Sequence, residues 1–365
     1  MSATAASASS KQASSAPTCR SSSRSAMYLA RTMTFMIGFI NFAEAISDPR
    51  FSAWGMVITR CVARGNVWAM SPSTVSELNR KIYAPIEAWR NQPLTGAHPY
   101  VYLDGIRLKR AWGGEVKNIS ILVAVRFNAQ GFRAILGVAE GLREDHESWL
   151  GFLRHLKQRG LQGVELVISD QCLGLVEALG EVFSEANWQR CVVHFYRNVF
   201  TVTPTGKVKE VAAMLKAVHA PEDLPAARPK LAQVVAKLAS WKLGKAAQLV
   251  REGMPETLSY YHFPREHWRN PRTNNPLERL NREIRRRTRV VGNFPDGHSA
   301  LMLVAARLRH MAGTKWGTRR YLDMSRLREL RSQPESPPTP DASATMPVLR
   351  TLTGKEAPQM IPAGV

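Results

Sequence analysis

Three carboxylates stand in sequence contexts that suit ligands of a divalent metal ion. Asp104 follows the apolar run Tyr100–Leu103, and Asp170 follows the largely apolar run 164–169. Glu278 precedes an arginine-dense stretch. Aspartates at the ends of buried strands are well placed as ligands, because the strand fixes the backbone while its end opens to solvent. Mg²⁺ prefers carboxylates, water and phosphates, and two-metal phosphodiester chemistry needs such ligands around ions about 3.5–4 Å apart.

The two aspartates also have structural interpretations. A strand-end aspartate such as Asp104 can cap a turn. Asp170 precedes a predicted helix, 173–183, and aspartate is a favoured N-cap residue. Capping and metal binding do not exclude one another, so both roles stay open for Asp170.

The sequence around Glu278 favours a helix cap when it is considered alone. With Asn275 as N-cap and Pro276 at the first helical position, Glu278 occupies the third position, where a capping-box glutamate belongs. Glu283, about one and a half turns further along, is the rival carboxylate for a metal.

Arginines crowd the predicted helix that runs from Asn275 to Arg289. The six that follow Glu278 are Arg279, Arg282, Arg285, Arg286, Arg287 and Arg289. Leu277, Leu280 and Ile284 give the helix an apolar face, so the arginines spread over its exposed sides. A solvated basic face is the ordinary explanation, but this density exceeds what solubility requires. Contact with phosphates is therefore favoured.

The cysteines predict neither a disulfide framework nor a paired-thiol zinc site. The four are Cys19, Cys61, Cys172 and Cys191, and none forms a CxxC pair, so reduced cytosolic thiols are expected. Cys191 and His194 form a Cys-x2-His pair without a second pair at zinc spacing. A buried cysteine beside a structural histidine is favoured over a catalytic dyad. The spacing of two residues in the sequence does not show the geometry that a dyad needs. His262 and His267 fit metal binding and aromatic packing equally well.

The overall charge indicates a polyanionic partner. Fifty lysines and arginines against 29 acids give a formal charge of +21, which favours nucleic acid first and an anionic membrane second. Residues 33–45 are apolar and loosely imitate a signal peptide, but the stretch is short for a membrane span and Glu44 interrupts it. A short buried helix is the favoured interpretation, and a membrane-associated basic protein is the least favoured one.

The elements that must position these residues alternate between strands and helices. Three strands, 100–110, 117–127 and 132–138, form a predicted antiparallel meander. A helix at 146–158, a strand at 164–169, a helix at 173–183 and a strand at 188–193 follow. Residues 205–260 show helical spacing and no strand signal. This order predicts a mixed sheet with helices on its faces and a helical insertion.

Longer motifs resemble one family, the bacterial mutator-type insertion-sequence transposases. The resemblance runs from about Ser71 to Leu322. Its carriers are Tyr102-Leu103-Asp104-Gly105, Val167-Ile168-Ser169-Asp170, the run from Trp188 to Phe195, His267-Trp268-Arg269, and the highly specific run from Arg272 to Gly292. It implies an α/β, RNase H-like mixed sheet with flanking helices, an all-helical insertion before the last acid, and an acidic triad of Asp104, Asp170 and Glu278.

The resemblance also implies a chemistry. Asp104 and Asp170 would hold two Mg²⁺ (or Mn²⁺) ions, and Glu278 would complete the shell of one. Activated water would cut DNA at terminal inverted repeats, and the released 3′-hydroxyl would attack target DNA. The arginines would hold the DNA backbone, and Cys191 with His194 match a family signature. The expected partners are double-stranded DNA and further copies of the chain on that DNA, without a membrane, in a cytoplasmic, nucleoid-associated setting.

The resemblance divides the chain into four predicted parts. Residues 1–60 are a disordered or atypical segment, and 61–95 are a remnant of a helix-turn-helix-like DNA-binding region. Residues 96–330 form the catalytic domain with an insertion at about 203–262, and 331–365 form a disordered tail. Gln171-Cys172 stand where the family usually has Gly-His, and Asn274 where threonine is usual. The atypical start predicts a truncated or fused copy, so an inactive DNA-binding remnant is the alternative function.

Overall fold

The computed structural model describes residues 72–112, 115–141 and 145–332. The predicted segment 1–60, including the apolar stretch 33–45, and nearly all of the predicted tail 331–365 lie outside this part of the chain. Within the described ranges, no helix combines the length and the apolarity that crossing a membrane requires.

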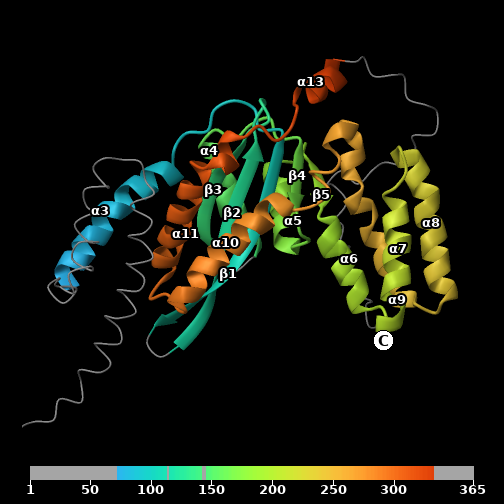
Figure 1. The fold of residues 1–365 in the computed structure, drawn as a ribbon, viewed down its shortest axis with the longest axis horizontal. Coiled ribbons are helices and arrows are strands. Elements are labelled where there is room, and N and C mark those ends of the chain that lie inside the picture. Colours follow the sequence, from blue (N-terminus) through green and yellow to red (C-terminus); the bar gives the residue numbers. More distant parts are fainter. Residues whose placement is uncertain (1–71, 113–114, 142–144, 333–365) are drawn as a thin grey trace, which may run out of the picture.

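A five-stranded mixed sheet forms the centre of the molecule (Figure 1). Its strands lie in the order β3-β2-β1-β4-β5. β1 (Tyr100–Trp112), β2 (Glu115–Phe127) and β3 (Arg133–Gly141) pair antiparallel, whereas β4 (Leu166–Ser169) and β5 (Asn187–Arg190) run parallel to β1. This sheet with its flanking helices confirms the predicted RNase H-like α/β fold.

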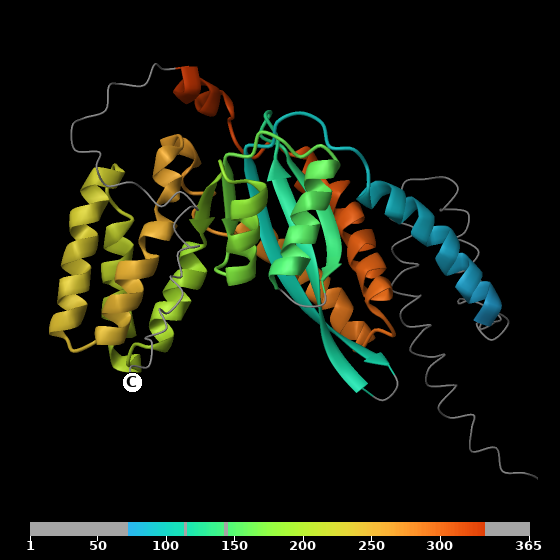
Figure 2. The same ribbon diagram turned by 180° about the vertical axis from the view of Figure 1, so that it is seen from behind.

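Helices cover both faces of the sheet. One face packs against α3 (Pro72–Arg90), α10 (Asn275–Val291) and α11 (Gly297–Ala312), and Figure 1 looks onto this side. The opposite face packs against α4 (His146–Gln158) and α5 (Leu173–Val182), which lie in front in Figure 2. α12 (Lys315–Thr318) and α13 (Ser325–Ser332) complete the chain's described end.

Alternation along β1 supplies both cores. Tyr100, Tyr102 and Ile106 belong to the core beneath α10 and α11, while Val101 and Leu103 belong to the core beneath α4 and α5. Successive side chains of a strand point to opposite faces. Asp104 therefore lies on the same face as Tyr102 and Ile106, which is the face that α10 covers.

The inserted helices form a separate bundle with its own core. They are α6 (Val192–Thr201), α7 (Val208–Val218), α8 (Leu224–Ser240) and α9 (Gly244–Gly253). Short 3₁₀ turns at Thr205–Lys207, Pro255–Thr257, Ser259–His262 and Arg265–His267 link this region to its neighbours. The bundle lies beside the β5 end of the sheet in both views (Figures 1 and 2).

One predicted strand end and the predicted placement of one residue were wrong, and contacts between distant segments explain both. The strand predicted to continue to residue 193 ends at Arg190, because the Val192 N–H turns away to the carbonyl of Arg272 and begins α6. Asp104, expected at a strand end, lies within β1, because β2 pairs with β1 along the full length from Tyr100 to Trp112.

Replacing Ile168 by alanine tests how strongly the packing of β4 supports the fold. Ile168, in β4, is fully buried in the core beneath α10 and α11. The cavity left by Ile168→Ala should lower the free energy of unfolding by about 2–5 kcal/mol in urea denaturation. Val116→Ala, at a position 58% exposed, should change it by less than about 0.5 kcal/mol. Equal effects of the two substitutions would contradict the packing described here.

Candidate active site

Strand register brings the two aspartates together. β1 and β4 pair in parallel, with Tyr102 opposite Ile168. Asp104 lies two residues after Tyr102, and Asp170 lies two residues after Ile168. The paired positions of β4 and β1 end at Ile168 and Tyr102. The two carboxylates thus occupy equivalent places on adjacent strands, one within β1 and one just past the end of β4.

Helix α10 brings the third part of the site to Asp104. Leu277, Leu280 and Ile284 are almost completely buried against the sheet, as the predicted apolar face requires. From this docked helix, the Asn281 amide Nδ2 donates a 2.6 Å hydrogen bond to Asp104 Oδ2. Asp104 Oδ1 accepts a second bond of 2.9 Å from the Gly105 N–H. The orientation of the Asp104 carboxylate is therefore fixed from two sides.

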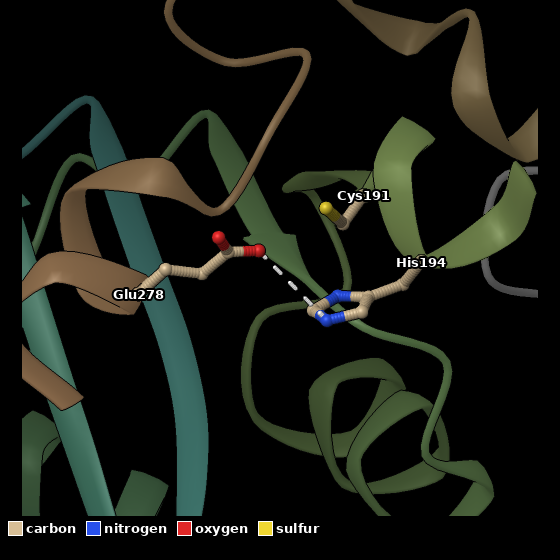
Figure 3. A group of neighbouring side chains, drawn as sticks. All are labelled: Cys191, His194 and Glu278. Carbon is tan, nitrogen blue, oxygen red and sulfur yellow. Dashed lines mark ion pairs between the residues drawn. The ribbon is translucent and has the colours of Figure 1, made fainter. Parts of the chain in front are cut away.

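Glu278 and Asp170 lie on either side of one histidine. His194 Nε2 is 3.9 Å from Glu278 Oε1, and His194 Nδ1 is 3.8 Å from Asp170 Oδ2. Figure 3 shows Glu278 extending from α10 toward His194, which α6 supplies. Because Asn281 lies three residues after Glu278, one side of α10 contacts Asp104 and also reaches His194. The structure thus brings all three predicted carboxylates to one region.

Cys191 adjoins this region from the start of α6. Among the described residues, one group of three metal-ligating side chains has all its donor atoms within 4.8 Å of one another: Cys191, His194 and Glu278 (Figure 3). Cys191 is fully buried, and its Sγ accepts a 3.4 Å hydrogen bond from the Asn274 N–H. This contact joins the start of α10 to the junction of β5 and α6.

The surroundings of His194 favour its charged form. Hydrogen bonding with the Cys191 side chain, followed by the charges of Cys191, Asp170 and Glu278, raises the pKa of His194 to about 9 against the opposing effect of burial. A cationic imidazole at neutral pH offsets part of the repulsion between the neighbouring carboxylates.

The capping interpretations are not realised in the structure. α10 is capped by Asn274 without a side-chain hydrogen bond, and Glu278 Oε1 is buried without any hydrogen-bond partner. Asp170 Oδ1 accepts a 2.8 Å bond from the Gln171 N–H, while the N-cap position of α5 belongs to Cys172. The carboxylates of Glu278 and Asp170 are thus not engaged in closing a helix end.

Glu283, the rival carboxylate, is neutralised by arginines. Its oxygens accept hydrogen bonds from Arg286 at 2.8 and 2.9 Å and from Arg307, and Arg287 lies 3.6 Å away. Hydrogen bonds from Arg286, together with the charge and hydrogen bond of Arg307, lower the pKa of Glu283 to about 2. Glu283 therefore serves as an ion-pair centre of α10.

The arginines of α10 divide into two groups. Arg286 and Arg287 are paired with Glu283. The other four, all exposed, make no side-chain hydrogen bond or ion pair with any described residue: Arg279, Arg282, Arg285 and Arg289. An exposed cation without an internal partner is free to contact a phosphate.

The two remaining candidate histidines have different environments. His267 is 1% exposed; its Nδ1 lies 2.8 Å from the hydroxyl of Tyr100 and its Nε2 lies 2.8 Å from the carbonyl of Asp323. Both ring nitrogens of His267 are thereby engaged in hydrogen bonds within the protein. His262 keeps an exposed surface, and the partial desolvation of its ring together with the charge of Arg228 lowers its pKa.

Two asparagines that sequence reasoning did not select complete the region. Asn281 holds Asp104, and Asn274 Nδ2 donates a 3.1 Å hydrogen bond to the Leu103 carbonyl. Both side chains are nearly inaccessible to solvent. The spacing between Glu278 and Asn281, one helical turn, was the available signal for Asn281.

The donors present fit a hard divalent cation. Carboxylate oxygens are the protein ligands that Mg²⁺ and Mn²⁺ prefer. The buried Oε1 of Glu278 has no hydrogen-bond partner, which is costly unless a cation or water satisfies it. Glu278, Asp104 and Asp170 therefore make a chemically suitable set for such ions.

Glu283→Gln should weaken the protein in a pH-dependent way. A depressed carboxylate pKa contributes stability that is present above the ordinary value of 4.5 and is lost as the pH falls toward about 2. At pH 7 the variant should therefore have a lower free energy of unfolding than the wild type. In denaturation series, this difference should shrink between pH 4.5 and 2. A constant difference across that range would contradict the role of Glu283 as an ion-pair centre.

Comparison with known proteins identifies the family. The profile described as "Transposase, Mutator family" matches residues 56–317. The chain is 38% identical over 261 residues to the transposase for insertion sequence element ISRM5 of Rhizobium meliloti, covering 72% of this chain and 65% of that protein. It is 38% identical over 277 residues to the transposase for IS1081 of Mycobacterium tuberculosis, covering 75% and 66%.

A third relative is more distant in sequence. The transposase for IS256 in transposon Tn4001 of Staphylococcus aureus is 32% identical over 262 residues, covering 71% of this chain and 67% of that protein. The matched region spans about two thirds of the length of these relatives. On the profile match and these identities, the chain belongs to the Mutator family of transposases.

Proposed function

We propose that this chain is a DNA transposase that cuts DNA at the ends of an insertion sequence and transfers the cut strand, using Asp104, Asp170 and Glu278. The observation that carries the proposal is the convergence of these carboxylates on one side of an RNase H-like sheet. Asp104 is held by α10, and Asp170 and Glu278 both lie within 4 Å of His194.

The three acids would be the ligands of two Mg²⁺ or Mn²⁺ ions. When bound, the ions would lower the pKa of the attacking hydroxyl or water and stabilise charge on the phosphate. Asp104 and Asp170 would hold the ions, because one lies within β1 and the other directly follows the adjacent parallel strand β4. Glu278 would complete one shell with the oxygen that has no internal partner.

Asn281 and Cys191 would act as positioning residues. Asn281 donates to Asp104 Oδ2 and so restricts the rotation of that carboxylate. Cys191 Sγ accepts a hydrogen bond from the Asn274 N–H and so fixes where α10 begins relative to β5. Both contacts limit movement of Glu278 with respect to the aspartates, which is what a preorganised metal site requires.

The exposed arginines of α10 would bind double-stranded DNA through its phosphates. Arg282 lies one turn beyond Glu278, and Arg285 one turn beyond Asn281, so both continue the side of the helix that carries the acids. Phosphates held along this row would lead the strand toward the carboxylates. The terminal inverted repeats and target DNA would be the partners, with further copies of the chain assembled on the DNA at the nucleoid.

Neutralising any of the three acids should abolish cutting without abolishing DNA binding. Asp104→Asn, Asp170→Asn and Glu278→Gln should each reduce cleavage of a supercoiled plasmid carrying the element's ends by at least about 10²-fold in Mg²⁺. DNA affinity in EDTA should stay close to that of the wild type, because none of these side chains is a proposed phosphate contact.

Glu283→Gln is the matched control on the same helix. Its carboxylate is occupied by arginines, so cleavage should persist. Cleavage that survives Asp104→Asn would refute the acidic triad. Wild-type protein that binds DNA but does not cut it in Mg²⁺ would favour the alternative, an inactive DNA-binding remnant.

Removing the unpaired arginines should weaken DNA binding in a salt-dependent way. The double variant Arg282→Ala/Arg285→Ala should flatten the slope of log affinity against log salt by about 0.9 for each lost phosphate contact. The measurement is a salt titration with a fluorescently labelled duplex.

A charge-matched control comes from the helical bundle. Lys245→Ala/Arg251→Ala removes two exposed positive charges from α9. It should leave the slope nearly unchanged. An equal flattening in both variants would show that DNA binding depends on the total positive charge and not on the arginines of α10.

A further inference from the structure

A cavity of about 440 Å³ lies between the helical bundle and the start of α10. Its volume falls within the range of about 300–1,000 Å³ that is usual for ligand pockets. The lining residues come from α6, α7 and the segment that leads into α10: Val192, Tyr196, Lys216, His219, Arg269, Arg272, Thr273 and Asn275. We call it the bundle pocket.

The bundle pocket adjoins the acidic site. Val192 directly follows Cys191, and Asn275 lies three residues before Glu278. The Val192 N–H donates a 3.0 Å hydrogen bond to the carbonyl of Arg272. This bond joins α6 to the segment that leads into α10. A strand bound at the carboxylates would therefore pass next to the pocket.

The lining carries positive charge and an aromatic ring, but no acid. Lys216, Arg269 and Arg272 supply the charge, and Tyr196 supplies the ring. His219 adds no charge at neutral pH, because burial and the neighbouring Arg272 lower its pKa to about 3. Cations beside an aromatic surface are the features that bind a phosphate and a base together.

The cations are arranged for two different roles. Arg272 is fixed: its guanidinium lies 4.6 Å from the Tyr260 ring centroid, and its Nη2 donates a 2.9 Å bond to the Tyr260 hydroxyl and another to the His219 carbonyl. Lys216 and Arg269 are exposed and form no ion pair with any described residue. Arg272 thus shapes the pocket, and the other two are available to a ligand.

We propose that the bundle pocket accepts one unstacked nucleotide of the DNA strand that is cut at the neighbouring carboxylates. The base would lie against Tyr196, and its phosphate would contact Lys216 and Arg269. This inference rests on the proposed DNA-cleaving function and adds a specific binding site to it. A paired nucleotide must first leave the duplex stack, which cancels much of the gain from the pocket. An unpaired nucleotide avoids that cost.

The pocket therefore predicts a preference for DNA with an unpaired end. Two probes are compared in EDTA, where no cleavage occurs: a blunt duplex, and the same duplex with a short unpaired 3′ tail on one strand. The wild-type protein should bind the tailed probe about tenfold more tightly, the scale of one base stacked on an aromatic ring.

Variants of Tyr196 test the stacking surface. Tyr196→Leu should bring the affinity ratio of the two probes close to one, whereas Tyr196→Phe keeps the ring and should keep the ratio. Circular dichroism establishes that each variant is folded. An undiminished ratio in folded Tyr196→Leu would overturn the proposal, as would equal binding of both probes by the wild type.

A second pair of variants avoids the bundle core. Lys216→Gln/Arg269→Gln alters exposed residues only, and should reduce the ratio even if Tyr196→Leu fails to fold. Lys230→Gln/Arg251→Gln removes the same charge from exposed positions of α8 and α9 and should leave the ratio unchanged. An equal reduction by both pairs would refute a localised pocket.

The two proposals fail in distinguishable ways. If the pocket is wrong, the probe ratio is insensitive to these variants while Asp104→Asn still abolishes cleavage. If the cleavage proposal is wrong, Asp104→Asn leaves cutting intact, whatever the probe ratio.

Discussion

The docking of α10 on β1 is the constraint on which the rest of the site depends. Burial of Leu277, Leu280 and Ile284 fixes the distance and rotation of the helix on the sheet. In that rotation Asn281 reaches Asp104 while Glu278 faces His194. The apolar contacts are not part of the chemistry, yet they decide which polar groups meet.

The helical bundle interrupts the chain between the second and third acids without separating them. Its two ends are held together by three hydrogen bonds. Gln189 Nε2 donates to the Thr257 carbonyl, and Gln189 Oε1 accepts from the Tyr260 N–H. The Val192 N–H donates to the Arg272 carbonyl. These buried bonds return the chain to the sheet close to where it left. The bundle can therefore vary in its outer helices while the position of α10 is kept.

Periodicity predicted the parts of the fold that local sequence determines. The helix at 146–158 was located to the residue, and the apolar face of α10 was assigned correctly, because both depend on side-chain spacing alone. The start of α6 was missed, and Asp104 was expected at a strand end although it lies within β1, because pairing with distant segments decides both. Similarly, Asp104 and Asp170 could be selected from strand patterns. The local cap interpretation of Glu278 failed, and its position became evident only when the sheet and α10 came together.

A strongly basic chain that concentrates acids at one point must keep those acids from being neutralised by its own arginines. α10 does so by geometry. Glu283 takes up Arg286, Arg287 and Arg307, whereas Glu278 lies on another side of the helix, and among the described residues its charged neighbour within ion-pair distance is His194. The unpaired arginines stay exposed on the same helix. One element can then present oxygen ligands and phosphate contacts side by side without the two charges cancelling.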